Sequence, residues 1–280
     1  MSTKRLLGIF AHPDDETLVG GTLLYYHEVG VETGLVFATR GEVGEISNDS
    51  ILAPPSNLKE IQEAEAQAAA DILHVDYLRF LEYRDSGRPG AADNQHPHCL
   101  KRARPAEVIG KLVAIIREFR PDVLLTFDEE GGYGHPDHVL IYRYATGAFH
   151  AAADEFEYPE LGPAHSAAKL YYCSISRRQA AILHEWLQEE AGESFFKDVN
   201  IDQLGLADEQ ISVVMDVERW RSQKMHASAQ YRTRKNPNTP LLHLPEELQQ
   251  KWYDTEYFQL ATSRVGDDTV GENDLFAHVS

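Results

Sequence analysis

The sequence predicts an α/β fold, a Rossmann-like and mostly parallel sheet with helices on both faces. Runs of apolar residues without alternation, typical of strands buried on both sides, recur through the first part of the chain. Stretches with helical spacing of apolar residues lie between them, and this alternation of strand and helix is the pattern of a parallel sheet. His- and Asp-rich segments follow two of the expected strands, where open α/β sheets bind their ligands.

Each expected element rests on a local pattern. Residues 6–10 form a continuous apolar run, and the apolar spacing that follows predicts a helix ended by Gly30. Pro105 suits the first turn of a helix that stops before Pro121. In the helix expected at 58–73, the predicted buried stripe consists of Ile61, Ala64, Ala68 and Ile72. The other expected elements are strands at 34–39, 77–81, 122–127 and 169–175 and helices at 16–29 and 135–150.

The patterns weaken beyond about Gln188. A helical stretch is expected near 217–230, followed by a loop-rich tail that contains Pro237, Pro240 and Pro245. We therefore expect one domain over 1–280, with a Rossmann-like core at about 1–175 and smaller C-terminal elements at about 176–280.

Composition limits the classes of function. The formal net charge of −19 repels phosphate backbones and anionic lipid surfaces, so neither nucleic acid nor membrane is an expected partner. The only cysteines are Cys99 and Cys173, which fits a reducing compartment. The short apolar run after Lys4 and Arg5 is interrupted by His12, and no apolar stretch is long enough to span a bilayer. We expect a cytoplasmic protein.

Two clusters carry residues suited to metal chemistry. The first contains His12, Asp14 and Asp15 directly after the first strand, and the second covers 134–138 in a later loop at the same edge of the sheet. Imidazole and carboxylate are ligands of catalytic zinc, which keeps a position open for water. Because adjacent aspartates cannot be directed identically at one ion, one ligates and the other acts as base. The alternative is that the aspartates only cap the following helix.

The two clusters also resemble a known family. The segment AHPDDE at 11–16, with HPDH at 135–138, resembles the PIG-L/LmbE-like zinc-dependent N-deacetylases in motif order and spacing. The segments 39–44 and 83–87 are similar to segments of the mycothiol-pathway members, which like those of the bacillithiol pathway are N-acetylglucosaminide deacetylases. The resemblance covers the first half of the chain well and the second half only in outline, around 224–230.

The resemblance implies roles for residues of both motifs. His12, Asp15 and His138 would bind Zn²⁺, or another divalent metal such as Fe²⁺, and Asp14 would be the general base. The remaining roles fall to His135 as electrostatic or acid partner of the tetrahedral intermediate, Asp137 as the residue that orients His135, Tyr133 at the oxyanion, and Arg40, Glu42 and Asp85 as substrate-binding residues. Where relatives carry an arginine three residues before the helix glutamate Glu65, this chain has Gln62, so no charged substrate contact is expected there.

The expected function is removal of an acetyl group from an N-acetylglucosaminide-type small molecule, which releases acetate and a free amine. Two alternatives remain: a metal-dependent amidase for a larger acyl group or a thiol conjugate, and a non-catalytic sugar- or metal-binding protein. Relatives often form trimers or hexamers, so a homo-oligomer is an expectation. Other polar candidates are a loop cluster (His96, His98 and Cys99) interpreted as solvated, and His226, interpreted as surface or pocket-lining. No G-x-S-x-G elbow is present, which argues against a serine hydrolase.

Overall fold

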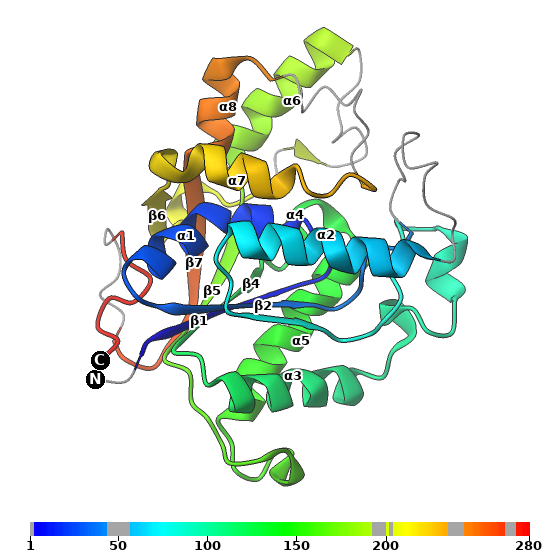
Figure 1. The fold of residues 1–280 in the computed structure, drawn as a ribbon, viewed down its shortest axis with the longest axis vertical. Helices are drawn as coiled ribbons and strands as arrows, with labels where there is room; N and C mark the ends of the chain where they lie inside the picture. The colour runs from blue at the N-terminus through cyan, green and yellow to red at the C-terminus, as the bar shows by residue number, and fades with distance from the viewer. Residues whose placement is uncertain (1–2, 44–56, 192–199, 202–203, 235–243, 267–272) are drawn as a thin grey trace.

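The structure, a computed structural model, describes residues 3–43, 57–191, 200–201, 204–234, 244–266 and 273–280. Within these residues the centre is a seven-stranded sheet with the order β3-β2-β1-β4-β5-β7-β6 (Figure 1). The strands are β1 (Arg5–Phe10), β2 (Glu32–Phe37), β3 (Tyr77–Phe80), β4 (Val123–Phe127), β5 (Lys169–Ser174), β6 (Val213–Asp216) and β7 (Thr255–Ser263).

The first five strands in this order are parallel, which confirms the predicted fold class. The side chains of Leu6, Leu7 and Ile9 in β1 are fully buried, as expected of a strand covered on both faces. Strand β1 pairs with β2 on one side and β4 on the other. The chain order therefore reverses between β1 and β4, and the crevice at the carboxyl ends of these two strands is where such sheets bind ligands.

Helices cover both faces of the sheet. In Figure 1, α1, α2 and α7 lie above the sheet, while α3 and α5 lie below it. Helix α2 packs against α7, and α3 packs against α5. The helices with a predicted counterpart are α1 (Gly20–Glu28), α2 (Leu58–Ile72), α3 (Pro105–Phe119), α5 (Pro136–Ala152) and α7 (Arg221–Ser228). A short helix α4 (Gly131–Gly134) precedes α5.

Two predicted helices differ in detail. The stretch predicted as one helix at 16–29 begins with a 3₁₀ helix at Asp15–Leu18, because the chain first turns back at His12, and α1 begins only at Gly20. The predicted buried stripe of α2 is wrong, since Ala64 is exposed and Ile61 is only half-buried. The face turned to the protein carries small side chains that let α7 approach closely; its buried residues are Gln62, Ala66, Ala69 and Ala70.

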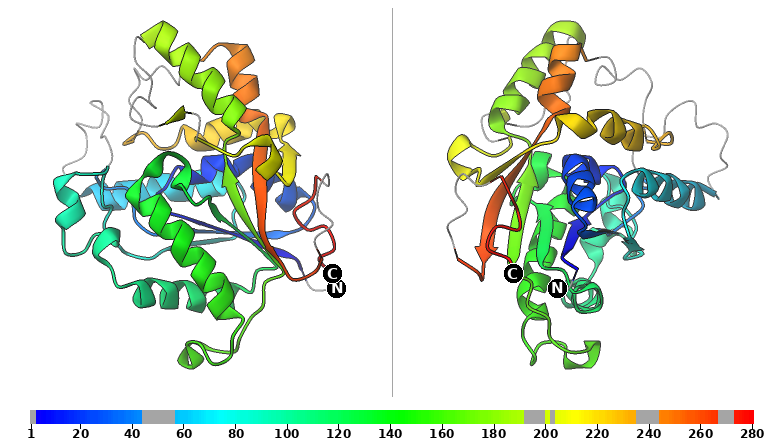
Figure 2. Two further views of the ribbon diagram at one scale, coloured as in Figure 1. Left: turned by 180° about the vertical axis from the view of Figure 1, so that it is seen from behind. Right: turned by 60° about the vertical axis from the view of Figure 1, so that its left-hand side comes forward.

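The C-terminal part contributes elements that the sequence did not predict. Strands β7 and β6 add to the sheet in antiparallel orientation next to β5. Helices α6 (Arg177–Ala191) and α8 (Glu246–Tyr253) lie side by side at one end of the molecule (Figure 2). They share a small second apolar cluster that includes Leu183, Leu187 and Leu244. Pro237 and Pro240 of the predicted tail lie outside the described residues.

The two described ends of the chain lie close together (Figures 1 and 2). The ammonium group of Lys4 donates a hydrogen bond to the carbonyl of Val279, with a distance of 2.6 Å. Among the described helices, none combines the length and apolar character that a bilayer crossing requires.

Candidate active site

The two predicted motifs meet at the carboxyl ends of β1 and β4. His12 follows the last residue of β1 by two positions, and the 3₁₀ helix after it carries Asp15. His138 lies in the first turn of α5, which the chain enters after β4. His12 and His138 are 2% and 3% exposed, so both imidazoles are withdrawn from bulk water. The fold therefore brings together residues that are 126 positions apart in the sequence.

Two imidazole nitrogens and one carboxylate form a small triangle. Nδ1 of His12 lies 3.2 Å from Nε2 of His138 and 3.5 Å from Oδ2 of Asp15. Nε2 of His138 lies 3.3 Å from Oδ1 of Asp15. Tetrahedral zinc with bonds of about 2.0 to 2.2 Å separates its ligand atoms by roughly 3.3 to 3.5 Å. The donor set and its spacing therefore fit a zinc ion.

The outer nitrogens of both histidines are directed by other groups. Nδ1 of His138 lies 3.0 Å from the carbonyl of Gly131, which accepts its proton and leaves Nε2 free to ligate. Nε2 of His12 lies 3.3 Å from Oδ2 of Asp137 and 3.5 Å from Oδ1 of Asp85. A proton on Nε2 of His12 leaves its Nδ1 free in the same way. Each imidazole thus turns a lone pair towards the centre of the triangle.

Asp137 contacts both His12 and His135. Its carboxylate faces His12 and accepts a hydrogen bond of 2.9 Å from the amide of Ser86, so this side chain orients His12. His135 instead accepts a hydrogen bond at Nδ1 from the backbone amide of Asp137, at 3.2 Å. The side chain and the backbone amide of Asp137 thus contact different histidines of the site.

Buried negative charge surrounds His12. Within the described residues, the carboxylates of Asp15, Asp85 and Asp137 all lie within 3.5 Å of its ring nitrogens. Burial opposes a charge on His12, but these carboxylates raise its pKa well above the usual value. Oδ1 of Asp137 is buried and lacks a hydrogen-bond partner among the described residues. A divalent cation would balance this charge, which is a second reason why the site fits a metal.

His135 and Tyr133 lie at the side of the triangle. Burial, together with the charges of His12 and His138, lowers the pKa of His135 to about 2, so its imidazole is neutral. Because Nδ1 accepts the Asp137 amide, the proton of the neutral ring is on Nε2, which can donate a hydrogen bond. The ring of Tyr133 packs edge-on against His138, and burial raises the pKa of this phenol to about 12. Both groups are therefore hydrogen-bond donors at neutral pH.

Asp14 differs from its neighbour Asp15. Its backbone has a φ of 92°, in the left-handed region that residues other than glycine rarely adopt. Its amide donates to the carboxylate of Glu16 at 2.8 Å, and its Oδ2 accepts from Nε of Arg234 at 3.1 Å. The side chain of Asp14 is 31% exposed, against 10% for Asp15. The two adjacent aspartates thus have separate surroundings, as expected for a base beside a ligand.

Sequence reasoning missed two residues that touch Asp14. Arg234 follows α7 and reaches a residue 220 positions earlier. Glu16 is fully buried, and burial raises the pKa of its carboxyl to about 8. The only signal in the sequence for Glu16 was its place within the first motif, whereas nothing local distinguished Arg234 from other arginines of the C-terminal part.

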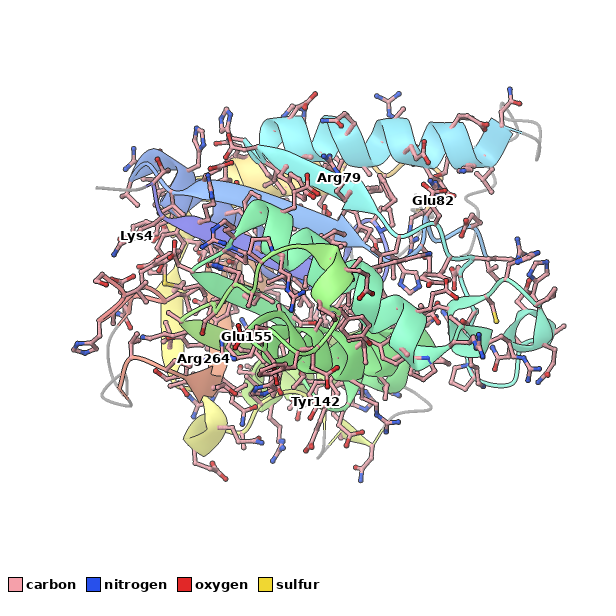
Figure 3. The ribbon with its side chains drawn as sticks, turned by 90° about the horizontal axis from the view of Figure 1, so that it is seen from below. Lys4, Arg79, Glu82, Tyr142, Glu155 and Arg264 are labelled. Carbon is pink, nitrogen blue, oxygen red and sulfur yellow. The ribbon has the colours of Figure 1, made fainter. Side chains whose placement is uncertain are left out.

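The three predicted substrate-binding residues are held by protein groups. Arg40 pairs with Glu63 and Glu82; Glu82 lies beside α2, as Figure 3 shows. These pairs hold the Arg40 guanidinium in place, and its substrate contact stays a prediction. Glu42 accepts the amide of Asp85 at 3.1 Å, and Asp85 is 3% exposed with its carboxylate turned to His12. Substrate contacts of Glu42 and Asp85 stay predictions.

The other polar candidates lie apart from the triangle. In the loop cluster, His96 and His98 have ring centroids 5.7 Å apart, and the buried thiol of Cys99 contacts the carbonyl of Asn94. His226 is exposed on α7. None of these groups faces the ligand triangle in the contacts of the described residues.

Comparison with known proteins agrees with the site. A model of the family PIG-L, described as GlcNAc-PI de-N-acetylase, matches residues 7–149, just over half of the chain. The chain is 35% identical to the 1D-myo-inositol 2-acetamido-2-deoxy-alpha-D-glucopyranoside deacetylase of Geodermatophilus obscurus, with 98% of each chain covered. It is 36% identical to the protein of the same name from Streptomyces avermitilis, over 99% of this chain and 98% of the relative.

Solved structures share the fold at lower identity. The N,N'-diacetylchitobiose deacetylase of Pyrococcus horikoshii is 20% identical, with a TM-score of 0.61 over 92% of this chain and 84% of that one. The 4-carboxy-2-hydroxymuconate hydratase of Pseudomonas putida is 18% identical, with a TM-score of 0.62 over 95% and 99%. Because one is named a deacetylase and the other a hydratase, the fold alone does not identify the reaction. The reaction is identified by the family match and by the full-length similarity to deacetylases. The chain belongs to the PIG-L family of de-N-acetylases.

Proposed function

We propose that this N-deacetylase is metal-dependent and acts on an N-acetylglucosaminide-type small molecule, from which it releases acetate and a free amine. The observation that carries the proposal is the triangle of His12, Asp15 and His138 with a separate carboxylate, Asp14, beside it. The named substrate of the relatives, an N-acetylglucosaminyl inositol, supports the substrate class. Cytoplasmic location and a trimeric or hexameric state remain predictions.

The metal would be held by Nδ1 of His12, Nε2 of His138 and the carboxylate of Asp15. Zinc in such a site supplies a Lewis acid that polarises the acetyl carbonyl and lowers the pKa of a water. Asp85 and Asp137 keep the His12 imidazole in the tautomer that can ligate. The Gly131 carbonyl does the same for His138.

The remaining residues handle protons and charge. Asp14 accepts a proton from the attacking water and later returns it to the amide nitrogen, so that the amine leaves neutral. Nε2–H of His135 and the phenol of Tyr133 donate hydrogen bonds to the oxygen of the tetrahedral intermediate, where negative charge develops. A neutral His135 performs this task as a donor and needs no additional proton.

Acetate release from a panel of N-acetyl sugars and glucosaminides, measured before and after chelation and metal restoration, tests the proposal. The Asp14→Asn variant should keep its metal content and lose about 10² to 10⁴-fold in kcat. Asp122→Asn is the matched control, because this carboxylate accepts the Arg5 amide at the opposite edge of the sheet. Release of larger acyl groups only would indicate the broader amidase, and metal binding without release from any substrate would indicate a binding protein.

A further inference from the structure

A four-residue segment from the C-terminal part of the chain lies directly on the first motif. This 231–234 segment follows α7 and contacts the motif at both ends. The hydroxyl of Tyr231 donates to Oε1 of Glu16 at 2.7 Å, and Nε of Arg234 donates to Oδ2 of Asp14 at 3.1 Å. Tyr231 is 1% exposed, so its contact with Glu16 is shielded from water.

The middle of the segment is fixed to α2. The backbone amide of Thr233 donates to Oε1 of Glu65 at 3.0 Å, and its hydroxyl donates to Oε2 at 2.6 Å. One carboxylate therefore holds both a main-chain and a side-chain donor of the same residue. Because both donors bond to the same side chain of α2, the segment has a defined position up to Arg234.

The conformation of Asp14 depends on these neighbours. A φ of 92° is unfavourable for a residue with a Cβ atom and persists only where surrounding groups impose it. Oε2 of Glu16 accepts the Asp14 amide at 2.8 Å, while Oε1 of the same carboxylate accepts Tyr231. Glu16 thus links the backbone of Asp14 to the 231–234 segment, and Arg234 links its carboxylate to the same segment.

The guanidinium group of Arg234 packs against the backbone of Gly41. A Cβ atom added to Gly41 would lie 1.4 Å from Nη1 and 2.6 Å from Cζ of Arg234, so the group rests directly on the glycine backbone. Nη1 is buried and has no hydrogen-bond partner among the described residues. Its position is therefore set by contact with Gly41 and by the ion pair with Asp14.

We infer that Arg234 is a positioning residue for the general base. Its guanidinium packs on the backbone of Gly41, and the rest of the 231–234 segment holds it in place. The inference rests on the proposed function, because it takes Asp14 to be the base. Arg234 holds Oδ2 of Asp14 and so fixes the direction of the carboxylate, while the link through Glu16 fixes its backbone. A misplaced base loses rate without losing metal, since none of these contacts involves a ligand atom of the triangle.

The test uses two independent ways to displace the same group. Arg234→Ala removes the guanidinium, and Gly41→Ala places a methyl group where the guanidinium lies. Arg221→Ala is the control for the first, because Arg221 forms a bidentate pair with Asp254 away from the motifs. Gly30→Ala is the control for the second: Gly30 has a φ of 84°, close to the 73° of Gly41, and no described atom lies within 4 Å of an added Cβ.

We expect Arg234→Ala and Gly41→Ala each to lower kcat by at least about tenfold with a KM within about threefold of wild type and unchanged metal content. The double variant should be no worse than the more severe single variant, since both changes remove one interaction. Arg234→Lys should recover part of kcat. A rise in KM at unchanged kcat would make Arg234 a substrate contact and overturn the inference, as would equal losses in the control variants.

A second measurement does not need substrate. Amide hydrogen exchange of the peptide that contains Asp14 should be faster in Arg234→Ala and Gly41→Ala, and unchanged in Arg221→Ala and Gly30→Ala. Unchanged exchange in the first pair would refute the inference even if the wild-type protein released no acetate. An inactive wild type with faster exchange in the first pair would refute only the proposed function.

Discussion

The carboxylate of Asp137 offers a sharp test of how the metal site is built. Its Oδ2 accepts the Ser86 amide at 2.9 Å and faces Nε2 of His12 at 3.3 Å, so it carries two contacts at once. Asp137→Asn retains an oxygen that can accept from the same two donors but removes the negative charge. The hydrogen bond from the Ser86 amide should therefore keep the side chain in place. The change then isolates the effect of the Asp137 charge on His12, the proposed ligand.

The expected effect is on metal affinity. Loss of a group that orients a ligand histidine typically raises the metal dissociation constant by 10- to 100-fold, which corresponds to about 1.4 to 2.7 kcal/mol. Because the Asn oxygen preserves the hydrogen bond and Asp85 still faces His12, we expect about tenfold for Asp137→Asn and about 100-fold for Asp137→Ala. Competition with a chromophoric chelator at fixed pH measures both, with Asp122→Asn as the control.

The alternative assignment makes a different prediction. If Asp137 instead acted through His135, the Asn variant would bind zinc with wild-type affinity and lose only kcat. A dissociation constant within about threefold of wild type, together with a lower kcat, would therefore refute the assignment to His12.

Further predictions concern metal, catalysis and stability. Chelation should abolish acetate release and lower the Tm, both restored by zinc, because a ligand present at about 100 times its Kd stabilises the folded state by about 2.7 kcal/mol. His135→Ala should lower kcat by about 10² to 10³-fold at unchanged metal content, as a lost oxyanion donor does. Glu256→Gln should destabilise the protein by about 3 kcal/mol in chemical denaturation, because it leaves the buried Lys224 ammonium without its charged partner. Burial and the charge of Arg120 lower the pKa of His165. At this position the folded state then binds fewer protons than the unfolded state just below pH 6.5, so the contribution of His165 to stability falls as the pH falls from 7 to 5. The Tm of wild type relative to that of His165→Gln should therefore decrease over this range.

The parts of the site that the sequence predicted are local. His12, Asp14 and Asp15 are contiguous and directly follow an apolar strand, and His138 begins the helix that follows another strand. Strand order in a parallel sheet then places both at one edge, so their meeting follows from motif and topology alone. The fold class could be predicted for the same reason, since it depends on buried strands with strong patterns.

The parts that could not be predicted depend on tertiary placement. The Asp137 side chain faces His12 while its backbone amide faces His135, and this arrangement depends on how α5 and the end of β1 come together, which no residue type encodes. The buried face of α2 carries Gln62 and alanines, whereas the larger apolar residues Ile61 and Ile72 are only half-buried, so the largest apolar side chains do not mark the buried face. Strand β7 mixes polar and apolar residues and has few fully buried positions, so its place in the sheet left no clear period in the sequence.

The long span of the site along the chain has a consequence for how the enzyme matures during synthesis. The three residues of the ligand triangle have all emerged once His138 and its helix have left the ribosome, but Arg234 follows 96 residues later. The residues proposed to bind metal are therefore synthesised well before the residue proposed to position the base. A nascent chain that ends before residue 231 carries all three proposed ligands, but its Asp14 lacks both links to the C-terminal part. In the proposed mechanism, placement of the base thus waits for the C-terminal part of the chain.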